Sequence, residues 1–241
     1  MARPRLVLVH GVGLDHTMWD TVADRLVTTF DVATPDLLGH GGRETAPVGV
    51  TLKDMADDLV QQLEPGTHLV GFSLGALVGQ HVARFRPDLV TSLTSASSVC
   101  QRTDDERAAV EIRLSAAEAS FEESVRVALH RWFHDTAVDP LAVQATESTL
   151  LANDPTSYVN CYRVFARGDA DIAAELSRIS VPSLAITGEL DPGSTPQMTR
   201  RLAREIPDCR AVVVPGARHL LPVQSPQPFA DALVSFIGGL S

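Results

Sequence analysis

The residues whose types suit chemistry begin with Ser73, at the centre of the pentapeptide Gly71-Phe72-Ser73-Leu74-Gly75. A short run that reads as a strand, His68–Val70, precedes it, and the segment 76–84 that follows has the composition and apolar spacing of a helix. Glycines allow a sharp turn and close approach, so the residue between such a strand and helix can project its hydroxyl from the sheet. We therefore interpret Ser73 as a nucleophile, although an isolated match of this length is also typical of an ordinary Gly/Ser turn.

A serine hydroxyl becomes a good nucleophile only when a histidine takes its proton and a carboxylate orients that histidine. The run Leu184–Pro192 places two acids just beyond a predicted strand, where a loop presents side chains at the carboxyl edge of a parallel sheet. We predict that Asp191 is the orienting carboxylate, and Glu189 is the local alternative. The loop after the preceding strand, 95–98, contains no acid.

The histidine predicted to act as the base is His219, in the loop that follows the strand-like run 212–214. The resulting chain order of serine, aspartate and histidine is the order that the nucleophile-elbow scaffold uses. His219 would take the proton from Ser73 and later deliver it to the leaving group, while Asp191 fixes the tautomer of the imidazole.

The donors for a developing oxyanion are predicted at the backbone N–H groups of Val12 and Leu74. Val12 lies in the turn Val9-His10-Gly11-Val12-Gly13 after the first predicted strand, and Leu74 directly follows the nucleophile. The same glycines could suggest a phosphate loop, but this turn lacks both the Lys-Ser/Thr ending of a P-loop and the third glycine of a dinucleotide fingerprint. We expect no cofactor.

Strands alternate with helices in the first hundred residues, and this alternation indicates a parallel sheet covered on both faces. From Asp104 to about Leu176 the chain is helical in pattern, and strand character then returns. We predict an α/β fold with a core of residues 1–100 and 179–241 and a helical cap, or lid, of residues 101–178 inserted before the last two strands. Helical padding on one flank is the alternative. The predicted strands are 6–9, 30–34, 67–70, 90–95, 181–187 and 211–214, and the predicted core helices are 17–26, 52–63, 74–85 and 229–237.

Length and composition suit a globular protein, because 241 residues with 44% hydrophobic content can bury a full core. We expect a cytoplasmic location, since residues 6–9 are too short for a signal-peptide core and no apolar run approaches the roughly 20 residues that span a bilayer. The net charge of −10 disfavours nucleic acid and anionic membranes as partners. Three widely separated cysteines, Cys100, Cys161 and Cys209, are expected to be buried thiols.

The motifs together resemble the α/β-hydrolase superfamily over nearly the whole chain. They are residues 8–11, 35–41, 71–75, 188–191 and 217–219. Within that superfamily, Arg131-Trp132-Phe133, the segment 153–162 and the run 179–182 resemble 3-oxoadipate enol-lactonases and small carboxylesterases.

The chain departs from the family pattern at three places. Leu38 replaces an arginine common in the family, Arg43 stands where a serine is usual, and an acid that often precedes the last family proline is absent from Val223-Gln224-Ser225-Pro226. These departures leave the predicted triad intact but weaken assignment to one named activity.

The predicted cap offers substrate contacts at Arg131 and Trp132. An arginine can pair with a carboxylate and an aromatic ring can exclude water from that pair, and the resemblance to enol-lactonases implies that this Arg-Trp pair binds the acid arm of a substrate. The alternative is that Trp132 packs the cap while Arg131 stays in solvent. Arg163 and Arg167 are further candidate anion contacts. His130 and His134 have the i, i+4 spacing of paired metal ligands, but no third ligand accompanies them and we expect no metal.

These observations predict a cofactor-independent serine hydrolase that cleaves an ester or lactone of a small substrate, with or without a carboxylate, through an acyl-enzyme. A carbon-carbon (β-diketone) hydrolase and a thioesterase would use the same triad. A slow or non-catalytic ligand receptor on this fold is the alternative of another class, and turnover distinguishes it from an enzyme.

Overall fold

The computed structural model describes residues 3–240, which contain one six-stranded sheet with the strand order β2-β1-β3-β4-β5-β6. Every neighbouring pair is parallel. The carboxyl ends of all six strands therefore meet at one edge, as the predicted site requires. The strands are β1 (Arg5–Val9), β2 (Asp31–Ala33), β3 (Thr67–Phe72), β4 (Val90–Ala96), β5 (Ser183–Gly188) and β6 (Cys209–Val214).

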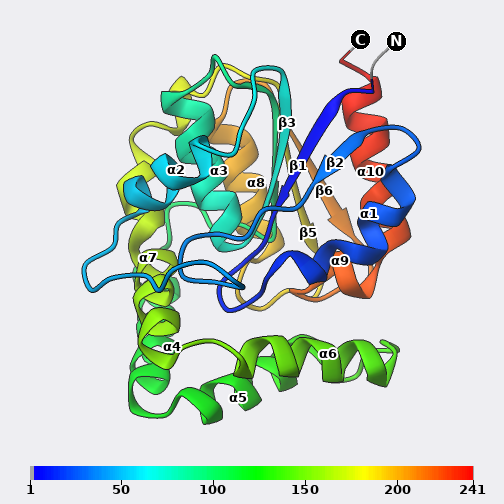
Figure 1. The fold of residues 1–241 in the computed structure, drawn as a ribbon. Coiled ribbons are helices and arrows are strands. Elements are labelled where there is room, and N and C mark those ends of the chain that lie inside the picture. The colour runs from blue at the N-terminus through cyan, green and yellow to red at the C-terminus, as the bar shows by residue number, and fades with distance from the viewer. Residues whose placement is uncertain (1–2, 241) are drawn as a thin grey trace.

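Helices cover both faces of this sheet, which explains why all six residues of β3 and of β5 are buried. On one face, α3 packs on the central strands, α8 packs on β5 and β6, and α2 lies outside α3 (Figure 1). On the other face, α1 and α10 pack against each other. The core helices are α1 (Asp20–Leu26), α2 (Leu52–Val60), α3 (Leu74–Phe85), α8 (Pro196–Glu205), α9 (Leu221–Gln224) and α10 (Pro226–Gly238), with a 3-10 turn η1 (His16–Trp19) before α1.

Four helices lie between β4 and β5 in the chain, where the sequence predicts a helical insert before the last two strands. Figure 1 shows α5 and α6 crossing the end of the molecule beyond the sheet, while α7 runs back along the flank of the core. α7 packs on α2 and α3, and α4 and α5 pack on each other. The insert therefore stands over the edge where the loops of the predicted site end. Its helices are α4 (Asp104–Ala119), α5 (Phe121–Phe133), α6 (Pro140–Leu151) and α7 (Pro155–Ala173), followed by the 3-10 turn η2 (Leu176–Arg178).

A buried ion pair joins the start of this insert to α7. The guanidinium of Arg102 donates to Asp169 at 2.6 Å and to the carbonyl groups of Phe165 and Ala166, and the Arg102 backbone N–H donates to the same carboxylate at 2.8 Å. Both side chains are only 1% exposed. Removal of one partner from such a buried pair leaves an uncompensated charge, so this contact holds the start of the insert firmly against α7.

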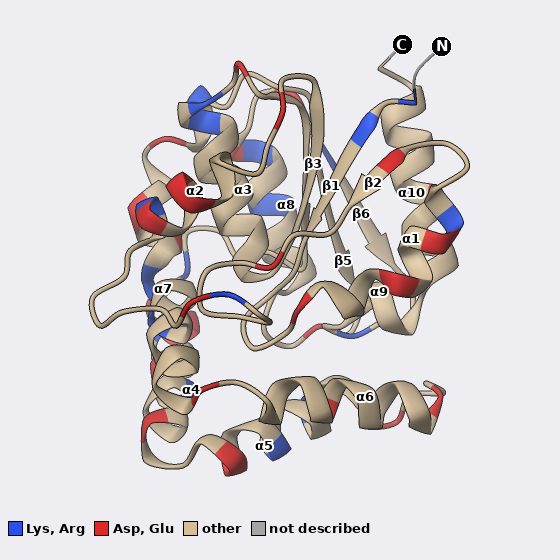
Figure 2. Cartoon of the chain, viewed as in Figure 1, with Lys and Arg blue, Asp and Glu red and all other residues tan. Residues whose placement is uncertain are grey.

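Apart from the Arg102–Asp169 pair and Asp191, the Asp, Glu, Lys and Arg residues of the described chain lie at least partly exposed on the periphery of the molecule. The strands β3, β4 and β5 contain no Asp, Glu, Lys or Arg, whereas acidic and basic residues are interspersed over the helices and loops (Figure 2). None of the helices in the described range is long and apolar enough to span a bilayer. Cys100 and Cys161 are buried free thiols as predicted, but Cys209 is partly exposed because it begins the edge strand β6.

Candidate active site

Ser73 occupies a strained turn between β3 and α3. Its φ of 54° and ψ of −111° lie in a region that residues with a side chain rarely adopt. The Ser73 backbone N–H donates to the Ala96 carbonyl at 2.9 Å, which ties the turn to the end of β4. The sheet and the helix thus hold the serine in a conformation that a free loop would abandon.

Two glycines make this turn sterically possible. A Cβ at Gly71 would lie 2.1 Å from the Gly75 carbonyl oxygen, and a Cβ at Gly75 would lie 2.5 Å from the carbonyl oxygens of both Val9 and His10. These contacts are with backbone atoms, which cannot move aside as the end of a side chain can. Gly71 and Gly75 therefore let β3, α3 and the end of β1 meet around Ser73.

Asp191 and His219 form a hydrogen-bonded pair at the same edge of the sheet. Oδ2 of Asp191 lies 2.7 Å from Nδ1 of His219, and the two side chains are 0% and 10% exposed. The loops after β5 and β6 bring these two side chains together. The loop after β6 can approach the end of β5 closely because Gly188 has no side chain. A Cβ at Gly188 would lie within 2.4 Å of the carbonyl oxygens of Ala217 and Arg218. Glu189, the alternative acid, instead accepts the Gly216 backbone N–H at 2.9 Å and is exposed.

The carboxylate of Asp191 is fixed on its other side by the backbone. Oδ1 accepts the N–H groups of Gly193 and Ser194, each at 2.9 Å. With Oδ1 occupied in this way, Oδ2 is directed at His219. A proton on Nδ1 satisfies this contact, so Nε2 of the imidazole is left as an acceptor on the other side of the ring.

The backbone N–H groups of Val12 and Leu74 have no hydrogen-bond acceptor within residues 3–240. Leu74 is the first residue of α3, whose early N–H groups have no intrahelical partner, and the turn after β1 brings Val12 to the same cavity as Ser73. Free N–H groups on both sides of a serine can stabilise negative charge that develops on a carbonyl oxygen.

His10 supports this arrangement in a way that the sequence analysis missed. It is 0% exposed, its Nδ1 lies 2.8 Å from the Gly11 carbonyl, and its Nε2 accepts the Leu37 N–H at 2.9 Å. Burial lowers the pKa of His10 to about 4, so the ring is neutral and can serve both contacts. His10 therefore anchors the turn that carries Val12. Its signal in the sequence was its place in the motif 8–11, directly after a predicted strand, although no role was assigned to it there.

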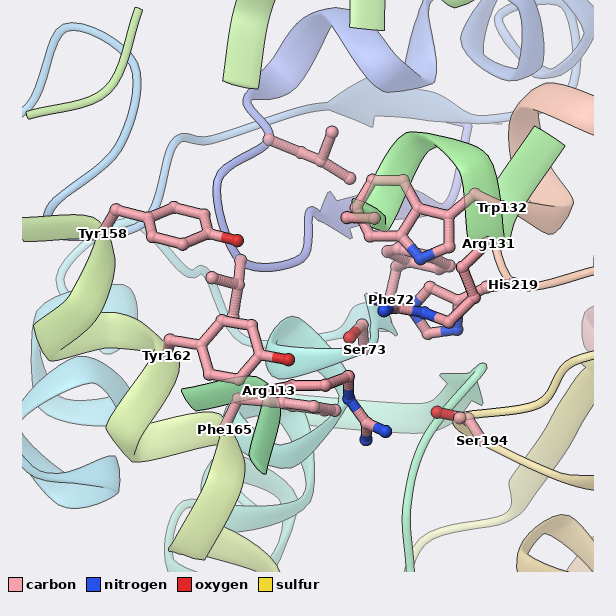
Figure 3. Close-up of a pocket in the computed structure, with 14 residues that line it drawn as sticks. Phe72, Ser73, Arg113, Arg131, Trp132, Tyr158, Tyr162, Phe165, Ser194 and His219 are labelled. Carbon is pink, nitrogen blue, oxygen red and sulfur yellow. The ribbon is translucent and has the colours of Figure 1, made fainter. Parts of the chain in front are cut away.

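A cavity beneath the cap joins Ser73 and His219. Its empty space, including the part that opens to solvent, is about 530 Å³, which suits a small-molecule ligand. Figure 3 shows the side chains of Ser73 and His219 at its base and aromatic side chains of the cap around it. Within the described residues, no hydrogen bond joins the Ser73 hydroxyl to His219. Both residues nevertheless line the cavity, and the His219 ring packs on Phe72 with centroids 5.1 Å apart.

The two cap residues proposed as substrate contacts both line this cavity. Trp132 stacks on His219, with ring centroids 5.6 Å apart and an angle of 28° between the planes. Arg131 is largely removed from solvent, and this burial lowers the pKa of its guanidinium. Arg163 and Arg167 lie elsewhere, because they pair with Glu118 and Glu111 on the surface of the cap.

Several residues of the cavity wall were not singled out from the sequence. They are Arg113 from α4, Tyr158, Tyr162 and Phe165 from α7, and Ser194 from the loop after β5. The i, i+4 spacing of the two tyrosines was a usable signal for a shared helix face. Arg113 and Ser194 gave no such signal, because only the packing of the cap on the core brings them to the same space.

The described part of the chain contains no group of three or more His, Cys, Asp or Glu side chains arranged to hold a metal ion. His130 and His134 stack on each other with ring centroids 4.6 Å apart. Nε2 of His134 lies 3.0 Å from Oδ2 of Asp135. The i, i+4 pair thus packs as neighbouring aromatic rings on the outside of the cap.

The fold and this site together define a capped α/β protein with a serine, a histidine and an aspartate at the carboxyl edge of its sheet. The model of the alpha/beta hydrolase family matches residues 6–232, and the chain belongs to this family. The membership and the parallel sheet flanked by helices confirm the predicted superfamily and fold class.

Relatives of known activity cover almost the whole chain. The (E)-2-((N-methylformamido)methylene)succinate hydrolase of Acinetobacter baylyi is 30% identical over 236 residues, 96% of this chain and 89% of the relative. The 3-oxoadipate enol-lactonase 1 of the same organism is 29% identical, with 97% and 88% covered. The crystal structure of the enol-lactonase from Burkholderia xenovorans superimposes with a TM-score of 0.86 at 25% identity, over 99% of this chain and 92% of that one. The predicted resemblance to enol-lactonases is therefore confirmed.

Proposed function

We propose that this protein is a cofactor-independent serine hydrolase that cleaves a small carboxylated ester or lactone through an acyl-enzyme. One observation carries the proposal. The strained Ser73 and His219, which is hydrogen-bonded to Asp191, line a single cavity beneath the cap. The names of two relatives support a hydrolase that acts on small carboxylated compounds.

In the first half of the proposed reaction, Oγ of Ser73 attacks the carbonyl carbon while Nε2 of His219 takes the hydroxyl proton. Asp191 keeps the proton of the neutral ring on Nδ1 and stabilises the imidazolium that forms. The N–H groups of Val12 and Leu74 donate to the oxyanion. His219 then gives its proton to the leaving oxygen as the ester bond breaks.

In the second half, His219 takes a proton from water, and the resulting hydroxide attacks the acyl-enzyme. The tetrahedral intermediate collapses, Ser73 recovers its proton from His219, and the carboxylic acid leaves. The stack of Trp132 on His219 holds the imidazole plane throughout both halves, and Phe72 supports the ring from another side.

Arg131 is the proposed contact for a carboxylate of the substrate. No ion pair joins it to any residue between 3 and 240, and no Asp or Glu lines the cavity. Its guanidinium stays protonated at neutral pH despite burial, because the ordinary pKa of arginine is above 12. A substrate carboxylate would therefore supply the counter-charge that the cavity lacks.

The test is hydrolysis of p-nitrophenyl acetate by the wild type, Ser73→Ala and the control Ser148→Ala, which removes an exposed hydroxyl from α6. We expect Ser73→Ala to fold normally and to lose at least about a thousandfold in kcat, as triad losses generally do. Ser148→Ala should retain wild-type turnover. Full activity of Ser73→Ala would refute the proposal, and binding without repeated turnover by the wild type would favour a receptor.

A further inference from the structure

The cavity contains a second cation that the proposed reaction does not use. Arg113, from α4, lines the cavity together with Arg131, from α5. Neither guanidinium has a hydrogen-bond or ion-pair partner among the described residues. Three other cap arginines, Arg126, Arg163 and Arg167, differ from these two because each pairs with a glutamate.

Two unpaired guanidinium groups in one confined space carry an electrostatic cost. Burial is the main cause of the lowered pKa of Arg131, and the nearby charge of Arg113 lowers it further. The two arginines also line an adjoining hollow between α4 and α5. Among the described residues that line this hollow, only Glu123 carries a carboxylate, and it is already paired with Arg126. The protein itself therefore supplies no anion that would balance both charges.

The cavity also holds two buried polar atoms that have no hydrogen-bond partner in the described structure. They are Nε1 of Trp132, next to Arg131 in the chain, and Oγ of Ser194. These residues are 7% and 0% exposed, and both line the cavity. A buried polar group without a partner costs free energy, so each is explained most directly by a ligand that completes it.

Ser194 is held so that its hydroxyl is available. Its backbone N–H donates to Asp191 and its carbonyl accepts from Thr187 at 2.8 Å, which leaves the side chain as its only free group. In Figure 3 the Ser194 hydroxyl is directed toward the interior of the pocket, on the side where the Arg113 guanidinium lies. Arg131 and Trp132 approach Ser73 from the cap helix α5.

We infer that the substrate is a dicarboxylate, with one carboxylate received by Arg131 and Nε1 of Trp132 and the other by Arg113 and the hydroxyl of Ser194. This inference rests on the proposed function for its reaction, but it makes a separate statement about binding. Arg113 and Ser194 are specificity residues in it, and they take no part in bond breaking. Each carboxylate accepts one hydrogen bond from a charged donor and one from a neutral donor, which offsets the loss of water.

Binding can be tested without turnover in Ser73→Ala protein. Thermal melting at constant ionic strength is measured with the linear dicarboxylates from malonate to adipate and with the monomethyl ester of each. We expect at least one dicarboxylate to raise the melting temperature more than its monomethyl ester does. This difference should disappear when Arg113→Gln is added and persist when Arg167→Gln, at an exposed and already paired arginine, is added instead.

Turnover gives the second readout. The p-nitrophenyl ester of propane-1,2,3-tricarboxylic acid is compared with the same ester after methylation of one of its two free carboxylates. The wild type should prefer the doubly charged ester in kcat/KM by about tenfold to a hundredfold, the range of one charged hydrogen-bonded contact. Arg113→Gln should abolish most of this preference, Ser194→Ala should reduce it, and Arg167→Gln should keep it.

Three results would overturn the inference. They are equal stabilisation by dicarboxylates and their monomethyl esters, no preference of the wild type for the doubly charged ester, and an equal loss on both esters in Arg113→Gln. Failure of the proposed function looks different, because the wild type would then not turn over p-nitrophenyl acetate, whereas the melting experiment would still report whether dicarboxylates bind.

Discussion

Asp191→Asn should remove most of the activity while leaving the fold intact, and the hydrogen bonds around this side chain explain why. The two backbone N–H groups that donate to Oδ1 at 2.9 Å need an acceptor at that position, so the amide oxygen must take that place. The amide NH₂ group then occupies the place of Oδ2, which lies 2.7 Å from Nδ1 of His219. Two donors cannot face each other, and the ring must therefore turn Nδ1 into an acceptor.

The proton of the neutral ring then lies on Nε2, which the proposed mechanism requires as the base for Ser73. A wrong tautomer of this kind typically lowers kcat by about ten thousandfold, equivalent to about 5.5 kcal/mol of transition-state stabilisation. The assay is steady-state hydrolysis of p-nitrophenyl acetate at pH 7.5, with circular dichroism to establish that the variant is folded.

Glu189→Gln is the matched control, because it makes the same chemical change two residues away. Glu189 contacts the Gly216 N–H and is exposed. The amide of the variant keeps an oxygen that can accept this N–H and makes no change at the reacting groups, so kcat should stay within about twofold of the wild type. If Asp191→Asn kept kcat within tenfold of the wild type, or if Glu189→Gln caused the larger loss, the assignment of Asp191 would be wrong.

Two further predictions concern stability. Gly75→Ala forces a Cβ to within 2.5 Å of two backbone carbonyl oxygens, so it should lower the free energy of unfolding by about 1–3 kcal/mol and the melting temperature by several degrees. In the control Gly168→Ala, the new Cβ meets Leu52 and Leu77 at an ordinary 3.5 Å. Equal melting temperatures of the two variants would contradict the steric argument. Burial lowers the pKa of His10 to about 4 and of His40 to about 3, so between pH 6.5 and 4 the unfolded chain binds protons that the folded one does not. As the pH is lowered through this range, the free energy of unfolding should therefore decrease by about 1.4 kcal/mol per pH unit for each histidine. Urea unfolding at pH 7, 6 and 5 should show a shallower decline in His40→Gln, and identical slopes would refute this account.

The sequence alone determined the scaffold and the chain order of the candidate triad. Strand-like runs that alternate with helices predict a parallel sheet, and a parallel sheet must bring the carboxyl ends of its strands to one edge. Ser73, Asp191 and His219 each follow such a strand, so their proximity follows from local patterns together with one topological rule. The glycines at 71 and 75 were also readable, because only a residue without a side chain fits a turn that tight.

Only the tertiary structure decided which groups face one another inside the site. Nothing in the spacing of Glu189 and Asp191 shows which of them reaches His219, since that depends on how two loops from separate strands close. Arg113 and Ser194 line one cavity although they lie about eighty residues apart in the chain, and Trp132 stacks on His219 across a separation of almost ninety residues. Such contacts carry no local sequence signal, because they arise from the packing of the cap helices on the core, which the chain as a whole determines.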